Sequence, residues 1–179
     1  MEKAVVLIDG GYLNRILRDN FKTGGINYLK FCELICQKLD AIRLRTYYYN
    51  CLPLVRENNK DDERRLSNFQ NFLRNLKRLP RFEVKLGKLQ FIGGKFRQKM
   101  VDVLMSLDIF KKSIGSNIRH IVLVAGDADF VPAIKIAKDS DVIIHLFCHS
   151  SSAHNELLDE VDEIHFLEED LIEKCKDDN

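Results

Sequence analysis

The sequence lacks the features that mark membrane and secreted proteins. No apolar stretch in its 179 residues approaches the roughly 20 consecutive apolar residues of a membrane-spanning helix. The N-terminus has no signal-peptide pattern, and the first expected strand already begins at residue 4. We therefore expect a cytoplasmic protein that does not act in a membrane.

The cysteines of the sequence do not form a pattern that indicates disulfide bonds. Five cysteines in a chain of this size do not indicate a disulfide-stapled fold. Cys32 and Cys36 are four residues apart on an expected helix, but no His or Cys pair nearby completes a tetrahedral metal site. We interpret them, together with Cys51, Cys148 and Cys175, as buried thiols.

Repeats, low-complexity linkers and the two common glycine-rich phosphate motifs are also missing. Neither Gly-x-Gly-x-x-Gly nor Gly-x4-Gly-Lys-Ser/Thr occurs, so nucleotide-cofactor binding of those kinds has no support. The length suits one domain. We expect a single domain over residues 1–170, followed by an acidic C-terminal tail at 171–179.

A net charge of +1 conceals an uneven distribution. Between Arg74 and Lys99 there are nine Lys or Arg and a single acid, Glu83. Such a segment suits a polyanionic partner, because each neutralised phosphate releases counterions, but a solvated basic face is an equal alternative. From Glu156 to the C-terminus, acids dominate instead.

Apolar runs alternate with stretches of helical period, which is typical of an α/β fold with a mostly parallel sheet. The expected strands are Ala4–Ile8, Leu44–Cys51, Phe82–Leu89, Ile118–Ala125 and Val142–Cys148, with a possible sixth at Glu163–Leu167. The expected helices are Tyr12–Asp19, Tyr28–Leu39, Asp61–Leu79, Lys99–Ser113, Phe130–Asp139 and Ala153–Val161. Asn27 is a suitable N-cap for the second helix.

Acidic residues follow these elements at three places. Asp9 ends the first strand, Asp127 and Asp129 follow the fourth, and Asp102 begins a helix. If the strand order is 3-2-1-4-5, strands one and four meet at the switch point where open α/β sheets bind ligands. Asp108, nearly two helical turns after Asp102, is a weaker member of this set.

A single Asp after a strand most often caps a helix or closes a turn. Several of them at one edge of a sheet repel one another, which raises at least one pKa unless a cation is present. Mg²⁺ or Mn²⁺ is the hard cation that carboxylates suit, and it can promote hydrolysis of a phosphodiester. The sequence therefore predicts a divalent-metal site.

Three segments carry a resemblance to a known family: Val5-Val6-Leu7-Ile8-Asp9-Gly10-Gly11-Tyr12, Lys99-Met100-Val101-Asp102-Val103, and Gly126-Asp127-Ala128-Asp129-Phe130-Val131-Pro132. Together they resemble the NYN domains of the PIN-like nuclease superfamily, in particular the LabA-like branch. The resemblance covers nearly the whole chain. It implies a three-layer α/β/α sandwich that cleaves RNA with Mg²⁺ or Mn²⁺, in which Asp9, Asp102, Asp127 and Asp129 are the metal-binding and catalytic residues.

The chain departs from the family pattern at Tyr12, where many members have Asn. Either Asn14 supplies the amide to the substrate or this polar contact is absent. Further substrate contacts are expected from Lys95, Arg97 and Lys99, in a basic loop that Gly93-Gly94 opens, and from Ser150 and Ser151. The two serines precede a helix, whose free N–H groups can bind a phosphate, although simple N-capping is the more common role.

Two other functions remain alternatives. An aspartyl-phosphate phosphatase would need an acid at Gly11 and another near Val131 or Pro132, and neither is present. A catalytically weak or inactive RNA-binding module with the same fold is compatible with the basic segment and with Tyr12. RNA is the expected partner, DNA is an alternative, and a homodimer is possible.

Overall fold

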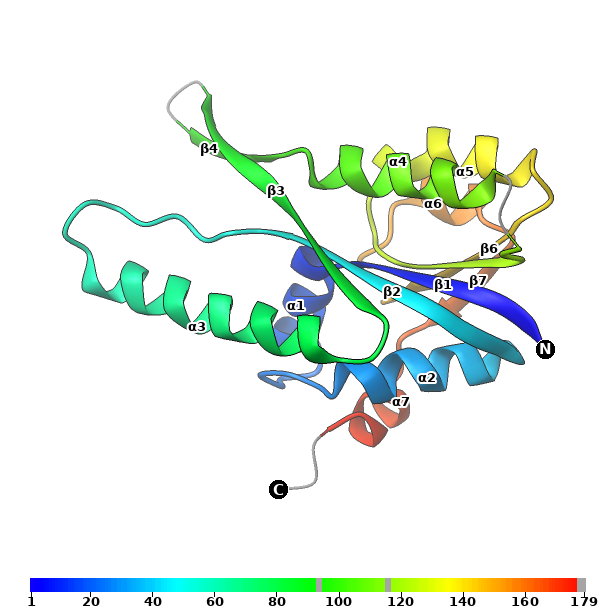
Figure 1. The fold of residues 1–179 in the computed structure, drawn as a ribbon, viewed down its shortest axis with the longest axis horizontal. Coiled ribbons are helices and arrows are strands. Elements are labelled where there is room, and N and C mark those ends of the chain that lie inside the picture. Colours follow the sequence, from blue (N-terminus) through cyan, green and yellow to red (C-terminus); the bar gives the residue numbers. More distant parts are fainter. Residues whose placement is uncertain (93–94, 115–116, 177–179) are drawn as a thin grey trace.

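The computed structural model describes residues 1–92, 95–114 and 117–176, and for residues 89–92 and 95–99 it describes the backbone alone. These residues form a sheet of seven strands between two layers of helices (Figure 1). The strands are β1 (Glu2–Asp9), β2 (Ala41–Cys51), β3 (Phe82–Ile92), β4 (Lys95–Lys99), β5 (His120–Val124), β6 (Ile143–Cys148) and β7 (Glu163–Phe166).

The strand order is β4-β3-β2-β1-β5-β6-β7. All neighbouring pairs are parallel except β3 and β4, which are antiparallel. The six parallel strands therefore have the order 3-2-1-4-5-6, which confirms the α/β fold and extends the expected order by a sixth strand. The arrangement is consistent with a PIN-like fold.

The helices cover both faces of the sheet. Helices α1, α2, α3 and α7 pack on one face, and α4, α5 and α6 pack on the other (Figure 1). Their bounds are α1 (Gly10–Asp19), α2 (Tyr28–Lys38), α3 (Lys60–Arg78), α4 (Val101–Ser113), α5 (Val131–Lys138), α6 (Asn155–Glu160) and α7 (Glu169–Lys174). A short 3₁₀ turn, η1 (Ala128–Phe130), precedes α5.

Strand β1 lies in the middle of the sheet and forms the centre of the core. Residues 4–8 are all buried, because helices cover both of its faces. This double coverage explains why the strand is a continuous apolar run rather than an alternating one. Asn27 caps α2 as expected, by accepting a hydrogen bond from the backbone N–H of Lys30 at 3.0 Å.

One expectation at the edge of the sheet needs correction. The basic stretch Lys95–Lys99 is not a loop: its backbone forms β4, an edge strand paired with the end of β3.

Near the C-terminus, the last helix spans Glu169–Lys174, and Ile172 and Cys175 are both buried. Only residues beyond 176 lie outside the described part of this end.

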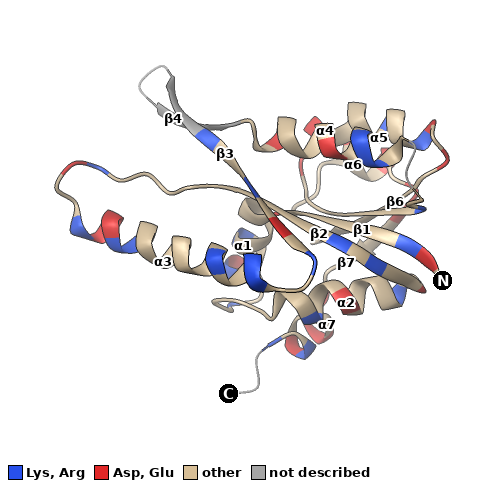
Figure 2. Ribbon diagram, viewed as in Figure 1, with Lys and Arg blue, Asp and Glu red and all other residues tan. Residues whose placement is uncertain are grey.

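The basic segment occupies several elements rather than one surface. Its Lys and Arg residues lie on the C-terminal half of α3, at Arg81 between α3 and β3, along β3 and in the backbone of β4 (Figure 2). One of them, Lys85, is used inside the fold, where its Nζ contacts the buried carboxylate of Asp108 at 2.5 Å.

The five cysteines are free and buried, as expected. Burial raises the pKa of the Cys32 thiol to about 12 and that of Cys36 to about 11, so both stay protonated near neutral pH. No helix among the described residues is long and apolar enough to cross a bilayer.

Candidate functional site

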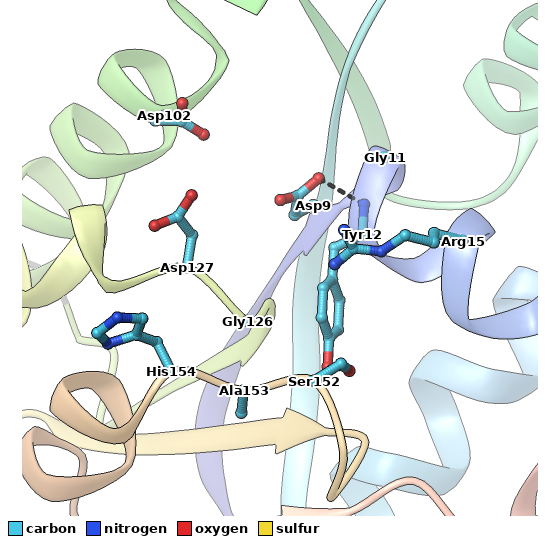
Figure 3. A pocket seen from close by; sticks show the side chains of 10 residues that line it. All are labelled: Asp9, Gly11, Tyr12, Arg15, Asp102, Gly126, Asp127, Ser152, Ala153 and His154. Carbon is cyan, nitrogen blue, oxygen red and sulfur yellow. Dashed lines mark hydrogen bonds between the residues drawn. The ribbon is translucent and has the colours of Figure 1, made fainter. Parts of the chain in front are cut away.

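Three of the four expected carboxylates open into one pocket. Asp9, Asp102 and Asp127 line a cavity of about 650 Å³ at the carboxyl ends of the central strands. Figure 3 shows the three carboxylates around a common space, each from a different element. This is the arrangement expected at the switch point of a parallel sheet.

The local backbone fixes the position of Asp9. It is the last residue of β1 and the N-cap of α1, and its Oδ1 accepts a hydrogen bond from the Tyr12 N–H at 3.0 Å. The parallel register pairs Ile8 with Val124, so the chain leaves β1 and β5 side by side. Asp9 and the Gly126-Asp127 turn are therefore neighbours although they are far apart in sequence.

Asp127 caps the η1 turn by accepting the N–H of Asp129 at 3.1 Å. Asp129 itself is exposed and faces a different hollow, an apolar groove of about 580 Å³ between α4 and α5. Asp102 lines both cavities, so the groove adjoins the acidic pocket. Asp129 is thus a peripheral member of the acidic set.

Burial and the neighbouring carboxylates raise the pKa of Asp9 and of Asp102. Burial is the largest cause for Asp9, whose pKa is raised further by the charges of Asp102 and Asp127, although hydrogen bonds from the backbone oppose this. Burial also raises the pKa of Asp102, and the charges of Asp127 and Asp129 add to the effect. The expected repulsion is present, and no ion pair of these four acids with a Lys or Arg occurs among the described residues.

The chemistry of this donor set fits a hard divalent cation. All the candidate ligands are carboxylates, which suit Mg²⁺ and Mn²⁺. The oxygens of these carboxylates are too far apart to form a compact cage around an ion. Among the described residues, the acids and histidines whose ligand atoms all lie within 4.8 Å of one another are in another part of the fold. Such spacing suits an ion that is held by one or two carboxylates and keeps several waters.

Tyr12 connects the two loops that frame the pocket. Its hydroxyl accepts the His149 N–H at 2.9 Å and lies 3.1 Å from the Ser152 Oγ. Its ring packs so closely on Gly126 that a Cβ there would lie 2.3 Å from the tyrosine Cε2. Tyr12 is therefore a structural part of the site, and Gly126 is required by this contact.

Asn14 lies away from the acidic pocket. Its Nδ2 donates to the Tyr48 hydroxyl at 3.1 Å, and its Oδ1 accepts from the Tyr28 hydroxyl at 2.9 Å. This side chain lines a neighbouring cavity of about 620 Å³. Among the residues whose side chains the structure describes, no Asn or Gln lines the acidic pocket, so Asn14 does not supply the amide there.

Asp108 belongs to the core rather than to the pocket. Its Oδ2 accepts hydrogen bonds from the Tyr49 hydroxyl and from Lys85 Nζ, both at 2.5 Å. Six residues along α4 turn its side chain away from Asp102 toward β2 and β3. The side chains of Asp102 and Asp108 are about 120° apart around the helix axis, and this separation is too large for the two to share one site.

The remaining expected contacts are only partly placed. The side chains of Lys95, Arg97 and Lys99 lie outside the described residues. Ser150 is exposed, and the exposed Ser151 pairs with His149, whose Nδ1 is 2.9 Å from its Oγ. Neither serine lines the acidic pocket, whereas the adjacent Ser152 does.

Arg15 and His154 also line the pocket and were not among the expected site residues. Arg15 is one helical turn after Tyr12, and its guanidinium carbon lies 5.7 Å from the centre of the tyrosine ring. Because residues three apart on a helix are neighbours, the spacing of Arg15 from Tyr12 is the sequence signal that could have identified Arg15. Arg15 brings a cation close to the three acids of the pocket.

The raised pKa of Asp9 has a consequence for stability. A carboxyl with a raised folded-state pKa destabilises the fold above that pKa, and the penalty disappears below its unfolded value. We therefore expect Asp9→Asn, which keeps an N-cap side chain, to raise the melting temperature at neutral pH in EDTA. Each kcal/mol gained would shift it by about 2–4 °C for a chain of this size.

Thermal melts of wild type and Asp9→Asn from neutral to acidic pH test this directly. The difference in melting temperature between the two proteins should vanish in acid. It should reverse sign when Mn²⁺ is added at neutral pH, because the variant lacks one metal ligand. A variant no more stable than wild type in EDTA at neutral pH would contradict the electrostatic account.

Asp108→Asn and Asp102→Asn should separate core from site. We expect Asp108→Asn to lower the free energy of unfolding by about 1–3 kcal/mol, because Lys85 loses its charged partner, while Mn²⁺ affinity stays unchanged. Asp102→Asn should instead weaken Mn²⁺ binding without lowering the free energy of unfolding. Denaturant titration and Mn²⁺ titration of both variants check this, and weakened Mn²⁺ binding in a folded Asp108→Asn would place Asp108 in the site after all.

Comparisons with known proteins support the fold. A crystal structure of a protein of unknown function from Vibrio parahaemolyticus is similar over 94% of each chain, with a TM-score of 0.67 and 20% identity. A UDP-glucosyltransferase from Polygonum tinctorium matches 84% of this chain and 30% of its own at 13% identity, but its TM-score of 0.33 carries no argument. No curated protein matches the chain.

The model of the NYN domain matches residues 3–168. This range includes the described sheet except Glu2, the first residue of β1, and it includes the whole acidic pocket. NYN domains belong to the PIN-like nuclease superfamily, which agrees with the strand order and with carboxylates at its switch point. The chain is a member of the NYN domain family.

Proposed function

We propose that this protein is a metal-dependent nuclease that hydrolyses phosphodiester bonds in RNA. The observation that carries the proposal is the pocket at the switch point, where Asp9, Asp102 and Asp127 face one another and form no ion pair with a Lys or Arg among the described residues. Membership in the NYN family supports nuclease chemistry there. Assignment to the LabA-like branch is part of the same proposal.

Asp9, Asp102 and Asp127 would hold Mg²⁺ or Mn²⁺, with Asp129 at the margin. A bound divalent cation supplies an activated water and neutralises charge on the phosphodiester. The protein's own contribution is to orient the ligands: the Tyr12 N–H fixes one oxygen of Asp9, and the Asp129 N–H fixes one of Asp127. Both carboxylates keep a second oxygen for the cation.

Arginine side chains in and beside this pocket would contact the phosphates of a bound substrate. Arg15 lines the acidic pocket itself, and Gly11 is shared with the neighbouring cavity, which also contains Arg18, Arg56 and Arg65. Arg56 and Arg65 both contact Asp62, at 2.7 and 3.9 Å, so their charge is partly neutralised. Arg15 makes no ion pair with an acid among the described residues, which makes it the best candidate for a phosphate contact.

A non-catalytic RNA-binding module is the second candidate function. The observation that favours it is the replacement of a polar amide by Tyr12, whose hydroxyl is engaged by His149 and Ser152 of the β6–α6 loop. Both candidates need the same surface to bind RNA. They differ in whether the acids promote cleavage.

Cleavage of a labelled single-stranded RNA in Mn²⁺ or Mg²⁺ separates the candidates. We expect cleavage by the wild type, loss of it in EDTA, and a decrease in Asp127→Asn larger than the roughly 10- to 100-fold that loss of an outer-shell partner costs. Asp159→Asn, which removes an exposed acid from α6, is the matched control and should cleave normally. A DNA of the same sequence tests the choice of substrate.

Each other outcome has a definite meaning. RNA binding without cleavage, unchanged in Asp127→Asn, would replace the nuclease by the binding module. Cleavage that persists in EDTA or in Asp127→Asn would contradict a mechanism that depends on a metal ion held by these carboxylates. Release of phosphate from a small monoester would indicate a phosphatase instead.

Arg15→Gln should weaken RNA binding without affecting the metal. Loss of one phosphate contact should lower affinity by a similar factor for every sequence and reduce the slope of log affinity against log salt by about 1. Filter binding at several salt concentrations with Ca²⁺ in place of Mn²⁺ measures both. Lys38→Gln, which removes an exposed cation from the C-terminal end of α2 outside the basic segment, is the control, and an equal loss in that variant would show only a general effect of charge.

A further inference from the structure

A second group of possible metal ligands lies on the sheet away from the acidic pocket. His145 on β6 and Glu163 and His165 on β7 place their ligand atoms within 4.8 Å of one another. The parallel register pairs His145 with Glu163 and Phe147 with His165, so these side chains share one face of the sheet. His120, the first residue of β5, extends the group toward the end of the sheet opposite the carboxylates.

The contacts within this group are close, but two of them are not hydrogen bonds. Glu163 Oε2 lies 3.1 Å from His145 Nδ1 and 3.4 Å from His165 Nε2. Both ring nitrogens are buried, and among the described residues neither has a hydrogen-bond partner of acceptable geometry. His145 is only 2% exposed, so water does not readily compensate its nitrogen.

Ligands of one metal ion produce this combination of short distance and poor alignment, because each lone pair points at the ion rather than at its neighbour. With zinc bond lengths to nitrogen and oxygen, two ligand atoms of a tetrahedral site lie roughly 3.3–3.5 Å apart. The two observed separations from Glu163 Oε2 are close to this value.

Counting protons leads to the same conclusion. Beyond His145, its Nε2 lies 2.9 Å from His120 Nδ1, and His120 Nε2 lies 2.8 Å from Glu2 Oε2. Four close contacts therefore join three imidazoles and two carboxylates. Three imidazoles with one N–H group each supply three protons for four contacts, so one contact is left without a proton unless a further proton or a metal ion binds there.

A cation beside Glu163 removes this conflict. If His145 Nδ1 and His165 Nε2 are ligands, His145 Nε2–H donates to His120, and His120 Nε2–H donates to Glu2. Such an outer chain fixes the tautomer and ring orientation of a metal-binding histidine.

We propose that His145, Glu163 and His165 bind a divalent transition metal of the zinc type, with a coordination position left for water. Imidazole and carboxylate ligands suit zinc, and Glu163, whose side chain is 53% exposed, gives the ion access from solvent. The site would fasten β7, a four-residue strand at the edge of the sheet, to β6. It does not depend on the nuclease proposal.

Titration of the metal-stripped full chain with Zn²⁺ in a calorimeter at neutral pH tests the site. We expect one ion per chain in the wild type and a loss of affinity of about 100-fold or more in Glu163→Gln and in His165→Gln, beyond the roughly 10- to 100-fold of an outer-shell change such as Glu2→Gln. Zinc should also raise the melting temperature of the wild type alone. With Co²⁺ as probe, wild type should show the intense visible absorption of a tetrahedral site.

The controls separate this site from other metal binding. His149→Gln removes a histidine that pairs with Ser151, and Asp127→Asn disables the acidic pocket; both should bind Zn²⁺ like wild type. Glu163→Gln keeps the size of a half-exposed side chain, so its fold should survive even if His165→Gln, which unstacks from Phe147, does not. Circular dichroism checks both.

Three results would overturn the proposal. One is the absence of zinc binding by the wild type at micromolar concentration. Another is unchanged affinity in a folded Glu163→Gln. The third is loss of zinc binding in Asp127→Asn, which would place the ion in the acidic pocket.

Discussion

The parallel pairing of β1 with β2 and β5 is the constraint on which the rest of the structure depends. At the carboxyl ends of the neighbouring strands β1 and β5, the chain leaves the sheet toward opposite layers of helices, into α1 after β1 and into η1 and α5 after β5. Asp9 leaves the sheet there beside the Gly126-Asp127 turn, and α4 brings Asp102 to the same opening. The backbone ladder sets the positions of Asp9 and of the Gly126-Asp127 turn, whereas Asp102 is positioned by α4, which the Lys85–Asp108 pair joins to β3.

The site conflicts with stability, and the surrounding contacts compensate for it. Asp9 and Asp102 are half-buried and repel other acids, which raises the pKa of both. Tyr12 opposes this locally: its N–H stabilises the Asp9 carboxylate, and its hydroxyl holds the β6–α6 loop against the pocket. A residue that looked in sequence like the loss of a family feature thus has a structural role in holding the site together.

Much of the fold follows from the sequence, because long apolar runs in a doubly covered sheet leave little choice of element or order. The antiparallel strand β4 was missed because Lys95–Lys99 is polar and contains one apolar residue, although two runs joined by Gly-Gly are also a hairpin signal. Side-chain direction was harder to predict. Asn14 and Asp108 have suitable spacing, but tyrosine hydroxyls bind both of them away from the pocket, and such contacts between distant elements leave no local pattern.

The central claim is that the carboxylates at the switch point hold a divalent cation. Anomalous diffraction at the manganese edge, from crystals of the protein grown with Mn²⁺, tests it most directly. The account predicts a peak within bonding distance of at least one of Asp9, Asp102 and Asp127, with waters completing the coordination. An ordered and accessible pocket without such a peak, at Mn²⁺ concentrations that support any activity the protein has, would contradict it.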